Sequence, residues 1–156
     1  MTTEQIEKIF SKTGAIRGGH FVYTSWRHGS SYVNKDKIYP NSFEIHRLCQ
    51  EIARKFAGEK PEVVVAPALG GIILSTWVSY HLTMITGKTV LGVYAEKEGE
   101  KFVLKRDYDK LILSKRVLVV EDVLTTGRSA RKVVELVRSH DGKVIGVGAL
   151  CNRGNV

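Results

Sequence analysis

The segment Val117–Ser129 constrains the fold of this chain more than any other stretch. It reads VLVVEDVLTTGRS: four apolar residues, two adjacent carboxylates, an apolar pair, and a turn of hydroxyl-bearing residues around a glycine. Four apolar residues in a row predict a strand buried on both faces, at Val117–Val120. Helical spacing follows at Ser129–His140. We therefore expect a buried strand whose solvent-facing end carries the carboxylates, and a polar loop that leads from it into a helix.

The rest of the chain alternates between helix-like and strand-like segments. Strands are predicted at Val63–Ala66, Thr89–Ala95 and Lys143–Leu150, and helices at Thr3–Ser11, from Asn41 or Ser42 to Gly58, and at Gly71–Thr86. Two short runs, Phe21–Ser25 and Ser31–Lys35, can form a hairpin. Glu96–Lys110 is polar and poorly periodic, as in a long loop that can contain short strand pieces. Such alternation predicts a parallel sheet with helices on both faces, whose ligands bind beyond the carboxyl ends of the strands.

Size and composition narrow the protein class. A length of 156 residues suits a single domain, and no apolar run approaches the roughly 20 residues that span a bilayer. The first residues lack the pattern of a secretory signal, and two isolated cysteines, Cys49 and Cys151, suit reduced thiols, so we expect the cytoplasm. The net charge of +8 suits nucleic acid, an acidic membrane or a phosphorylated small molecule, although a plain basic surface explains it equally well.

The loop after the predicted strand has the chemistry of a phosphate site. Backbone N–H groups and hydroxyls converge at a helix N-terminus, and Gly127 lets the backbone approach an anion. Glu121 and Asp122 would repel a phosphate but accept hydrogen bonds from ribose hydroxyls, or lie near a metal. The simpler alternative is that Asp122 or Thr125 caps the helix and Glu121 is solvated. P-loop, dinucleotide-binding, zinc and nucleophile-elbow motifs are absent from the sequence.

The whole segment closely resembles the phosphoribosyl pyrophosphate signature of type I phosphoribosyltransferases. The resemblance implies an α/β fold with a central, mostly parallel sheet flanked by helices and a small N-terminal hood. One domain would cover 1–156, with residues 1–40 forming a helix and hood and residues 41–156 the core. It also implies that the donor, phosphoribosyl pyrophosphate, contacts Glu121, Asp122, Val123, Leu124, Thr125, Thr126, Gly127, Arg128 and Ser129.

Two further segments are similar to the orotate phosphoribosyltransferase family. Val64–Ile72 looks like its pyrophosphate loop, so Leu69, Gly70 and Gly71 would contact the donor, although some members carry a lysine in place of Gly70. Glu96–Arg106 falls where the family has a mobile catalytic loop. Its basic residues would bind pyrophosphate, with Lys97 and Lys101 as the first candidates and Lys105 and Arg106 next. Taken alone, the first stretch is equally a glycine-rich turn and the second a solvated loop.

The acceptor residues follow from two weaker similarities. Gly19–Lys35 resembles the family's hood, in which Tyr32 would stack on the base and Thr24 and Ser25 would lie near the donor, although Trp26 stands where a glycine is usual and Gly29 where a serine is common. Arg153 matches an arginine that hydrogen-bonds orotate, with Asn152 in place of the usual aspartate. The alternatives are Tyr32 in the hood core and Arg153 in solvent. The family commonly continues beyond the position of Val156 with a segment that completes the hood.

The resemblance implies transfer of ribose 5-phosphate to orotate, which gives orotidine 5′-monophosphate and pyrophosphate in pyrimidine nucleotide biosynthesis. The residues expected to act in catalysis are Lys97, Lys101, Glu121 and Asp122, and those expected to bind orotate are Tyr32, Thr125 and Arg153. Mg²⁺ would be carried mainly by the donor, near Asp122. A homodimer is implied, with loop 96–110 reaching the partner site, and neither membrane nor nucleic acid as a partner. The alternatives are a purine or other base as acceptor, a nucleic-acid-binding regulator of the same fold, or a structural α/β domain.

Overall fold

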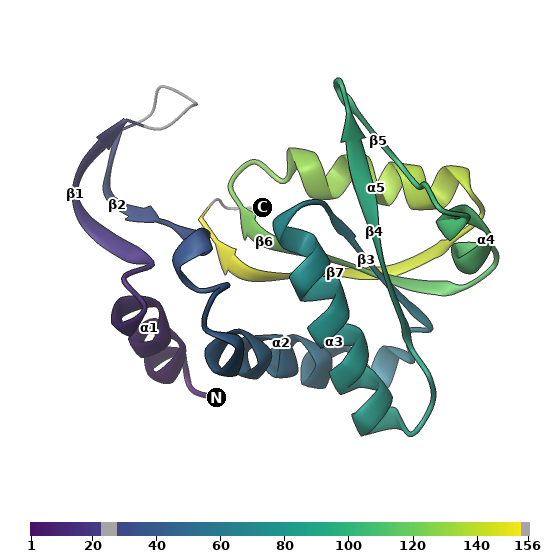
Figure 1. Ribbon diagram of the computed structural model, residues 1–156, viewed down its shortest axis with the longest axis horizontal. Helices are drawn as coiled ribbons and strands as arrows, with labels where there is room; N and C mark the ends of the chain where they lie inside the picture. Colours follow the sequence, from purple (N-terminus) through teal and green to yellow (C-terminus); the bar gives the residue numbers. More distant parts are fainter. Residues whose placement is uncertain (23–27, 154–156) are drawn as a thin grey trace. The chain divides into compact units, whose positions relative to one another are not determined.

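The fold is known from a computed structural model, which describes residues 1–22 and 28–153 (Figure 1). The chain divides into two units, Met1–Ile45 and His46–Val156. The boundary falls close to residue 40, where the sequence predicts the end of the hood. That the two units make a single domain stays a prediction. Within residues 1–22 and 28–153, no helix combines the length and apolar character that a membrane crossing requires.

The amino-terminal unit contains a helix and a hairpin. Helix α1 (Thr3–Lys12) begins with a capping box between Thr2 and Gln5 and buries Ile9 and Phe10. Strands β1 (Ile16–Val22) and β2 (His28–Val33) pair antiparallel, and a 3₁₀ turn, η1 (Lys35–Lys37), follows them. The predicted hairpin is therefore present, but its first strand begins earlier than predicted. Gly18 and Gly19 lie inside β1, where the register shifts between Gly18 and Phe21.

The second unit is built on a five-stranded sheet in the order β5-β4-β3-β6-β7. Its strands are β3 (Val63–Pro67), β4 (Leu91–Glu98), β5 (Lys101–Val103), β6 (Arg116–Leu124) and β7 (Lys143–Asn152). All neighbouring pairs are parallel except β4 with β5. The helices are α2 (Ser42–Phe56), which begins in the first unit, α3 (Gly70–Thr86), α4 (Tyr108–Ile112) and α5 (Arg128–Ser139), with a 3₁₀ turn, η2 (Ala57–Glu59), after α2. The predicted mostly parallel sheet is confirmed.

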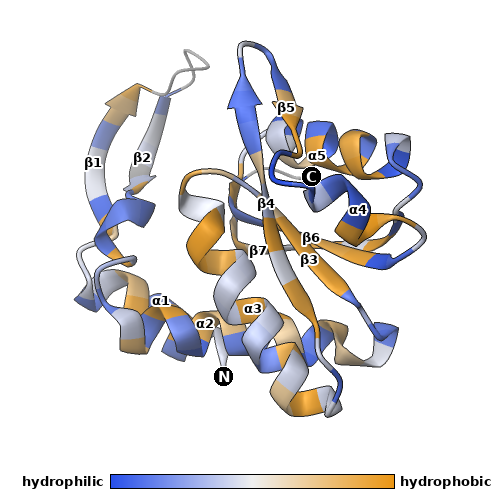
Figure 2. Cartoon of the chain, turned by 45° about the vertical axis from the view of Figure 1, so that its right-hand side comes forward, coloured by the Kyte–Doolittle hydropathy of each residue, from blue (hydrophilic) through white to orange (hydrophobic). Residues whose placement is uncertain are grey.

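Both faces of this sheet are covered by helices. Alternate residues of β3 and β6, such as Val65 and Val119, pack with Val133 and Val137 of α5. On the other face α2 comes so close that a Cβ on Gly146 of β7 would lie 2.6 Å from the Phe56 ring, and α3 so close that a Cβ on Gly92 of β4 would lie 2.6 Å from the Ser79 hydroxyl. Figure 2 shows β3 and β6 as largely hydrophobic ribbons between these layers. The apolar runs therefore form strands because each run has an apolar layer on both sides.

Two elements differ from the sequence-based expectation. Strand β6 continues four residues past Val120 to Leu124, because β7 is also longer than predicted and pairs with it as far as Leu124 and Asn152. The expected loop 96–110 contains the end of β4, the short strand β5 and helix α4. A turn at Gly99 (φ +57°) joins the two strands, and Phe102 of β5 packs against the core. A sequence that is polar overall thus forms a hairpin through a few apolar anchors.

Candidate active site

The junction between β6 and α5 forms a pocket of about 150 Å³. It is lined by Glu121 and by residues 123–130, which include the predicted phosphate loop. Gly127 precedes the helix in a left-handed conformation (φ +68°), and no described side chain caps α5. The first N–H groups of an uncapped helix have no intrahelical partner and carry partial positive charge, so they form a ready site for an anion. Thr125, Thr126, Arg128 and Ser129 are exposed around them.

The two carboxylates lie within β6 and are buried, with Glu121 7% exposed and Asp122 4% exposed. Both accept hydrogen bonds from the backbone: the Asp122 N–H donates to Glu121 Oε1 (3.2 Å) and the Val123 N–H donates to Asp122 Oδ1 (2.7 Å). The sequence placed the pair beyond the strand, at its solvent-facing end, and the structure corrects this because the ladder with β7 extends across them. Burial holds both carboxylates in fixed positions, and Glu121 lines the phosphate pocket.

The predicted pyrophosphate loop lies at the same edge of the sheet. Strands β3 and β6 are parallel neighbours, so the residues that follow them emerge together. The Ala68–Leu69 peptide bond is cis, and the Leu69 side chain is 83% exposed. Gly71 lies against β3 so closely that a Cβ there would be 2.7 Å from the Ala66 Cβ. The close packing of Gly71 leaves no room for a side chain at that position, while Leu69 presents its side chain to solvent at this edge of the sheet.

The β4–β5 hairpin carries the basic residues in two different states. Lys105 pairs with Glu98 (2.6 Å), and Arg106 pairs with Glu96 and lies over the Tyr94 ring. Lys97 and Lys101 are exposed, and neither forms an ion pair with any described residue. The two lysines that the sequence ranked first are thus the two whose charge is not offset by a carboxylate.

Sequence reasoning missed one residue that bears on the hairpin. Lys132 of α5 donates to the backbone carbonyl of Glu100 at the hairpin tip, and its ammonium group lies 3.5 Å from the Glu100 carboxylate. The contact joins segments 32 positions apart, so no local pattern announces it. It attaches the hairpin to the helix whose N-terminus forms the phosphate pocket.

The predicted acceptor residues fall in both units. The Arg153 N–H donates to the Leu124 carbonyl (2.8 Å), which places its backbone beside the phosphate loop. Burial raises the pKa of Cys151, which pairs with Val123 across the strands, so its thiol keeps its proton. Tyr32 lies on β2 in the amino-terminal unit, 40% exposed, with its ring 5.6 Å from that of Phe21. The predicted contacts at Thr24, Ser25 and Trp26 lie outside the described residues.

The structure brings most of the predicted donor residues to one edge of the sheet. Leu69, Gly70, Gly71, Glu121, Asp122, Val123, Leu124, Thr125, Thr126, Gly127, Arg128 and Ser129 follow or end strands β3 and β6, and Lys97, Lys101 and Lys105 belong to the hairpin that starts at the neighbouring end of β4. Arg153 joins them from the end of β7. An anion cradle, two fixed carboxylates and two unpaired lysines therefore belong to the same side of the fold.

Comparison with known proteins identifies relatives over nearly the whole chain. The family model described as "Phosphoribosyl transferase domain" matches residues 34–155. The orotate phosphoribosyltransferase of Pelotomaculum thermopropionicum is 43% identical over 99% of this chain and 78% of its own length. That of Desulforamulus reducens is 40% identical over the same shares. The crystal structure of orotate phosphoribosyltransferase from Aeropyrum pernix aligns with a TM-score of 0.65 at 24% identity, over 95% of this chain and 81% of that chain, which shows the shared fold.

Proposed function

This chain belongs to the orotate phosphoribosyltransferase family, and from that premise we propose that it transfers the ribose 5-phosphate group of phosphoribosyl pyrophosphate to orotate. The products are orotidine 5′-monophosphate and pyrophosphate, as in the biosynthesis of pyrimidine nucleotides. The observation that carries the proposal is the β6–α5 junction, where uncapped helix amides and the buried carboxylate of Glu121 line one pocket. A phosphate and a ribose joined to each other need these two kinds of partner side by side.

The phosphate loop holds the donor in place for the reaction. The amides of Arg128, Ser129 and Ala130 and the hydroxyls of Thr125 and Thr126 bind the 5′-phosphate, with the helix dipole favouring its charge. Gly127 allows the backbone to curve around the phosphate because it adopts a conformation that disfavours side chains. Fixing one end of the sugar removes much of the orientational freedom that a bimolecular reaction would otherwise have to lose.

The carboxylates act on the ribose. A ring nitrogen of orotate forms a bond to the anomeric carbon and loses its proton to solvent, while the bond from that carbon to pyrophosphate breaks and pyrophosphate leaves with the electron pair. Positive charge develops on the ribose ring as the leaving group departs. Asp122 and Glu121 accept hydrogen bonds from the ribose hydroxyls and stabilise this charge, and burial strengthens the effect because few water molecules screen it.

The leaving pyrophosphate is bound by backbone amides and lysines. The loop Leu69–Gly71 supplies N–H groups, while Lys97 and Lys101, with Lys105 behind them, supply positive charge from the hairpin. Mg²⁺ adds positive charge to the pyrophosphate when bound. The donor set suits an ion carried by the substrate, because the described residues contain no group of three possible metal ligands and Mg²⁺ commonly uses one or two carboxylates together with substrate phosphates. Asp122 is the carboxylate that would lie near it.

In this proposal, orotate is bound by Arg153, Tyr32 and Thr125. The guanidinium of Arg153 forms two parallel hydrogen bonds to the orotate carboxylate, a group that uracil and purines lack. Tyr32 stacks on the pyrimidine ring. We further propose a homodimer in which the segment 96–110 reaches the partner's site. The free thiols of Cys49 and Cys151 suit a reducing compartment, and we propose the cytoplasm.

A steady-state assay of pyrophosphate release tests the proposal. The protein is incubated with phosphoribosyl pyrophosphate and Mg²⁺, and with orotate, uracil, adenine or hypoxanthine as the acceptor. Among the four acceptors, we expect turnover only with orotate. Addition of EDTA should abolish this turnover, and excess Mg²⁺ should restore it. Turnover with a purine but not with orotate would contradict the acceptor while leaving the donor site intact. No turnover with any base, in protein that binds phosphoribosyl pyrophosphate by calorimetry, would contradict the enzymatic function.

A further inference from the structure

A second, larger pocket opens at the opposite end of the sheet from the phosphate loop. Its volume is about 800 Å³, and it is lined by the amino ends of three strands, where Val63 begins β3, Leu91 leads β4 and Arg116 begins β6. Pockets of roughly 300–1,000 Å³ hold drug-sized ligands and cofactors. The lining shares no residue with the phosphate pocket. Along β6, the five residue steps from Arg116 to Glu121, the nearest lining residues of the two pockets on this strand, span about 17 Å.

The wall of this pocket is largely apolar. Its apolar lining residues are Ala57, Pro61, Val63, Ile85 and Leu91, of which Pro61 and Val63 are buried. Ile85 is 45% exposed and Leu91 is 38% exposed, so both present apolar atoms to an entering molecule. The hydroxyls of Thr86 and Thr89 add polar atoms at the end of α3. A site of this kind suits the flat or aliphatic body of an organic molecule and is poorly matched to an inorganic ion alone.

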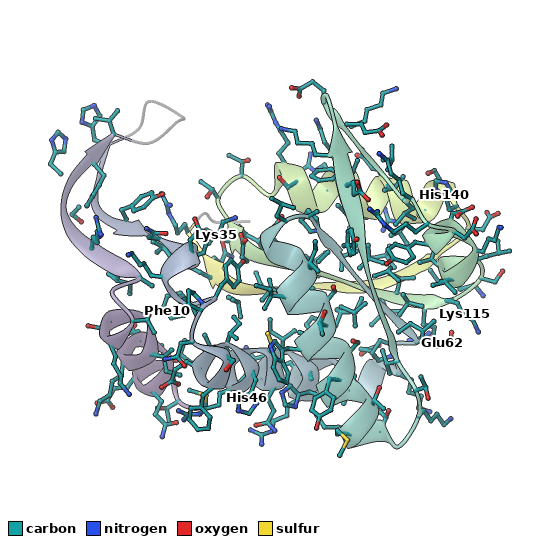
Figure 3. All side chains as sticks on the ribbon, viewed as in Figure 1. Phe10, Lys35, His46, Glu62, Lys115 and His140 are labelled. Atoms are coloured by element: carbon teal, nitrogen blue, oxygen red, sulfur yellow. The ribbon has the colours of Figure 1, made fainter. Side chains whose placement is uncertain are left out.

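The polar groups of the pocket are mainly cationic. Four basic side chains, Lys60, Lys88, Lys115 and Arg116, line it together with a single carboxylate, that of Glu62, which leaves an excess of three positive charges. Two of the four are already paired: Lys115 Nζ lies 3.0 Å from Glu62 Oε1, and the Arg116 guanidinium donates to the Glu59 carbonyl (2.6 and 2.9 Å). Figure 3 shows Glu62 and Lys115 labelled close together. The Glu62 carboxylate also accepts from the Arg116 N–H, and this bond and Lys115 lower its pKa, so it stays ionised.

Lys60 and Lys88 remain without an acidic partner in the part of the chain that the structure describes. They enter the pocket from different elements, Lys60 from the turn after η2 and Lys88 from the turn after α3. Lysine ammonium groups bind phosphate as point charges, and two of them match the charge of a phosphomonoester better than that of a single carboxylate. The pocket therefore combines an apolar wall with two ammonium groups, whose positive charge matches the negative charge of a phosphate dianion.

We propose that this pocket binds a phosphorylated small molecule with an apolar or aromatic body, of the nucleoside monophosphate class, at a site separate from the active site. The apolar wall takes the body of the ligand, and Lys60 and Lys88 take its phosphate. The inference does not depend on the proposed transferase function, since none of the lining residues belongs to the donor or acceptor site. Strand β6 is shared by the two pockets, so the ligand would bind to the same strand that carries Glu121 and Asp122.

Titration of the full chain with adenosine 5′-monophosphate, followed by the chemical shifts of the backbone amides, tests the proposal. Shifts in residues 60–63 and 86–91 report the new pocket, and shifts in residues 125–130 report the phosphate loop, so the two sites are read separately. We expect saturable shifts in the first set. Adenosine and inorganic phosphate are titrated alone, and each should bind at least about tenfold more weakly than the nucleotide, which corresponds to roughly 1.4 kcal/mol.

Two variants that should change the affinity for the nucleotide in opposite directions make the test independent of any loss of structure. The double variant Lys60→Gln/Lys88→Gln should weaken nucleotide binding in the new pocket by about tenfold or more, while the control Lys8→Gln/Lys55→Gln, which makes the same change in net charge at residues outside the pocket lining, should leave it unchanged. Glu62→Gln should tighten binding about two- to fivefold, because it removes the one lining carboxylate. The pocket variants Lys60→Gln/Lys88→Gln and Glu62→Gln should both transfer phosphoribose at the normal rate.

Three outcomes would overturn the proposal. Nucleotide shifts confined to residues 125–130 would mean that only the phosphate loop binds. Equal affinity for adenosine and its monophosphate would show that the lysines do not select an anion. Equal weakening by the control variant would show that the overall positive charge of the protein, rather than Lys60 and Lys88, attracts the ligand.

Discussion

The β6–α5 junction and the β4–β5 hairpin start from the carboxyl ends of β6 and β4, the two strands that flank β3, and both are proposed to bind the phosphates of one substrate. The junction is made of backbone: a fully paired strand, a left-handed glycine and uncapped helix amides. The hairpin is made of charged side chains: Lys105 and Arg106, just beyond β5, pair with glutamates, whereas Lys97 and Lys101 on the strands form no ion pair with a described residue. Figure 2 shows the end of β4 as hydrophilic.

The difference between the two regions is one of preorganisation. Amides held by the hydrogen bonds of the sheet and helix are in place before the substrate arrives, so they stabilise developing charge without reorganising. A lysine must lose rotamer entropy of up to about 2 kcal/mol to hold its charge in one place. We therefore expect loss of a buried carboxylate at the junction to have the largest effect on catalysis, and changes in the hairpin to have graded effects.

The largest effect is expected from Asp122→Asn. The substitution keeps the shape of a side chain that is 4% exposed but removes the charge that stabilises the ribose in the transition state. We expect kcat/KM to fall about 100- to 1,000-fold with little change in the KM for orotate. The measurement is the steady-state rate with orotate. The matched control is Asp141→Asn, at an exposed turn with φ +58°, which asparagine tolerates; equal losses in both variants would contradict a specific role for Asp122.

The next effect separates the lysines of the hairpin. Lys97→Ala and Lys101→Ala should each lower kcat about ten- to 100-fold, because each removes a charge that no described carboxylate offsets. Lys105→Ala should lower it less, since Glu98 and Glu96 already offset that charge at 2.6 and 3.8 Å. Lys110→Ala, which removes an exposed lysine paired with Asp107 at 2.9 Å, is the control. If Lys105→Ala lost as much activity as Lys101→Ala, the ion pairs of the hairpin would not persist during the reaction.

The difference between the junction and the hairpin also explains which parts of the fold could be predicted from the sequence. The junction was predictable because its signals are local: four apolar residues for the strand, and Gly127 followed by regular apolar spacing for the helix. The mostly parallel sheet followed from the alternation of such segments. The end of β6 was not predictable, because Glu121–Leu124 join the strand only through pairing with β7, and no local signal states how long the partner strand is.

The β4–β5 hairpin shows which structural features could not be predicted from the sequence. Its polar sequence predicted a loop, whereas the fold depends on Phe102 reaching the core and on ion pairs between residues of the two strands and the turn beyond them. Which lysine is paired depends on side-chain geometry that spacing does not encode. The contact of Lys132 with Glu100 links a helix to a turn across the fold and could not be inferred from either segment alone.

A smaller effect should come from Gly127→Ala, which tests whether the backbone itself forms the phosphate site. At φ +68° an added Cβ costs about 1–2 kcal/mol, so unfolding in urea should begin at lower concentration. The KM for phosphoribosyl pyrophosphate should rise severalfold as the turn shifts. Gly58→Ala is the control, since Gly58 does not have a positive φ and a Cβ there would meet nothing within 4 Å. An unchanged KM in folded Gly127→Ala would mean that side chains, rather than the curved backbone, hold the phosphate.

The smallest effect is expected from Lys132→Ala, which releases the hairpin tip from α5. The Lys132 side chain is 33% exposed and its partner Glu100 is 88% exposed, so the pair contributes at most about 1 kcal/mol to stability. Hydrogen exchange should quicken at residues 97–103 and stay unchanged at residues 117–124, because only the hairpin loses an attachment. We expect kcat/KM to change less than about threefold, since Lys97 and Lys101 keep their charges. A loss comparable to that of Asp122→Asn would break the distinction between the two regions, because it would make a single surface contact of the hairpin as essential as the buried carboxylate of the junction.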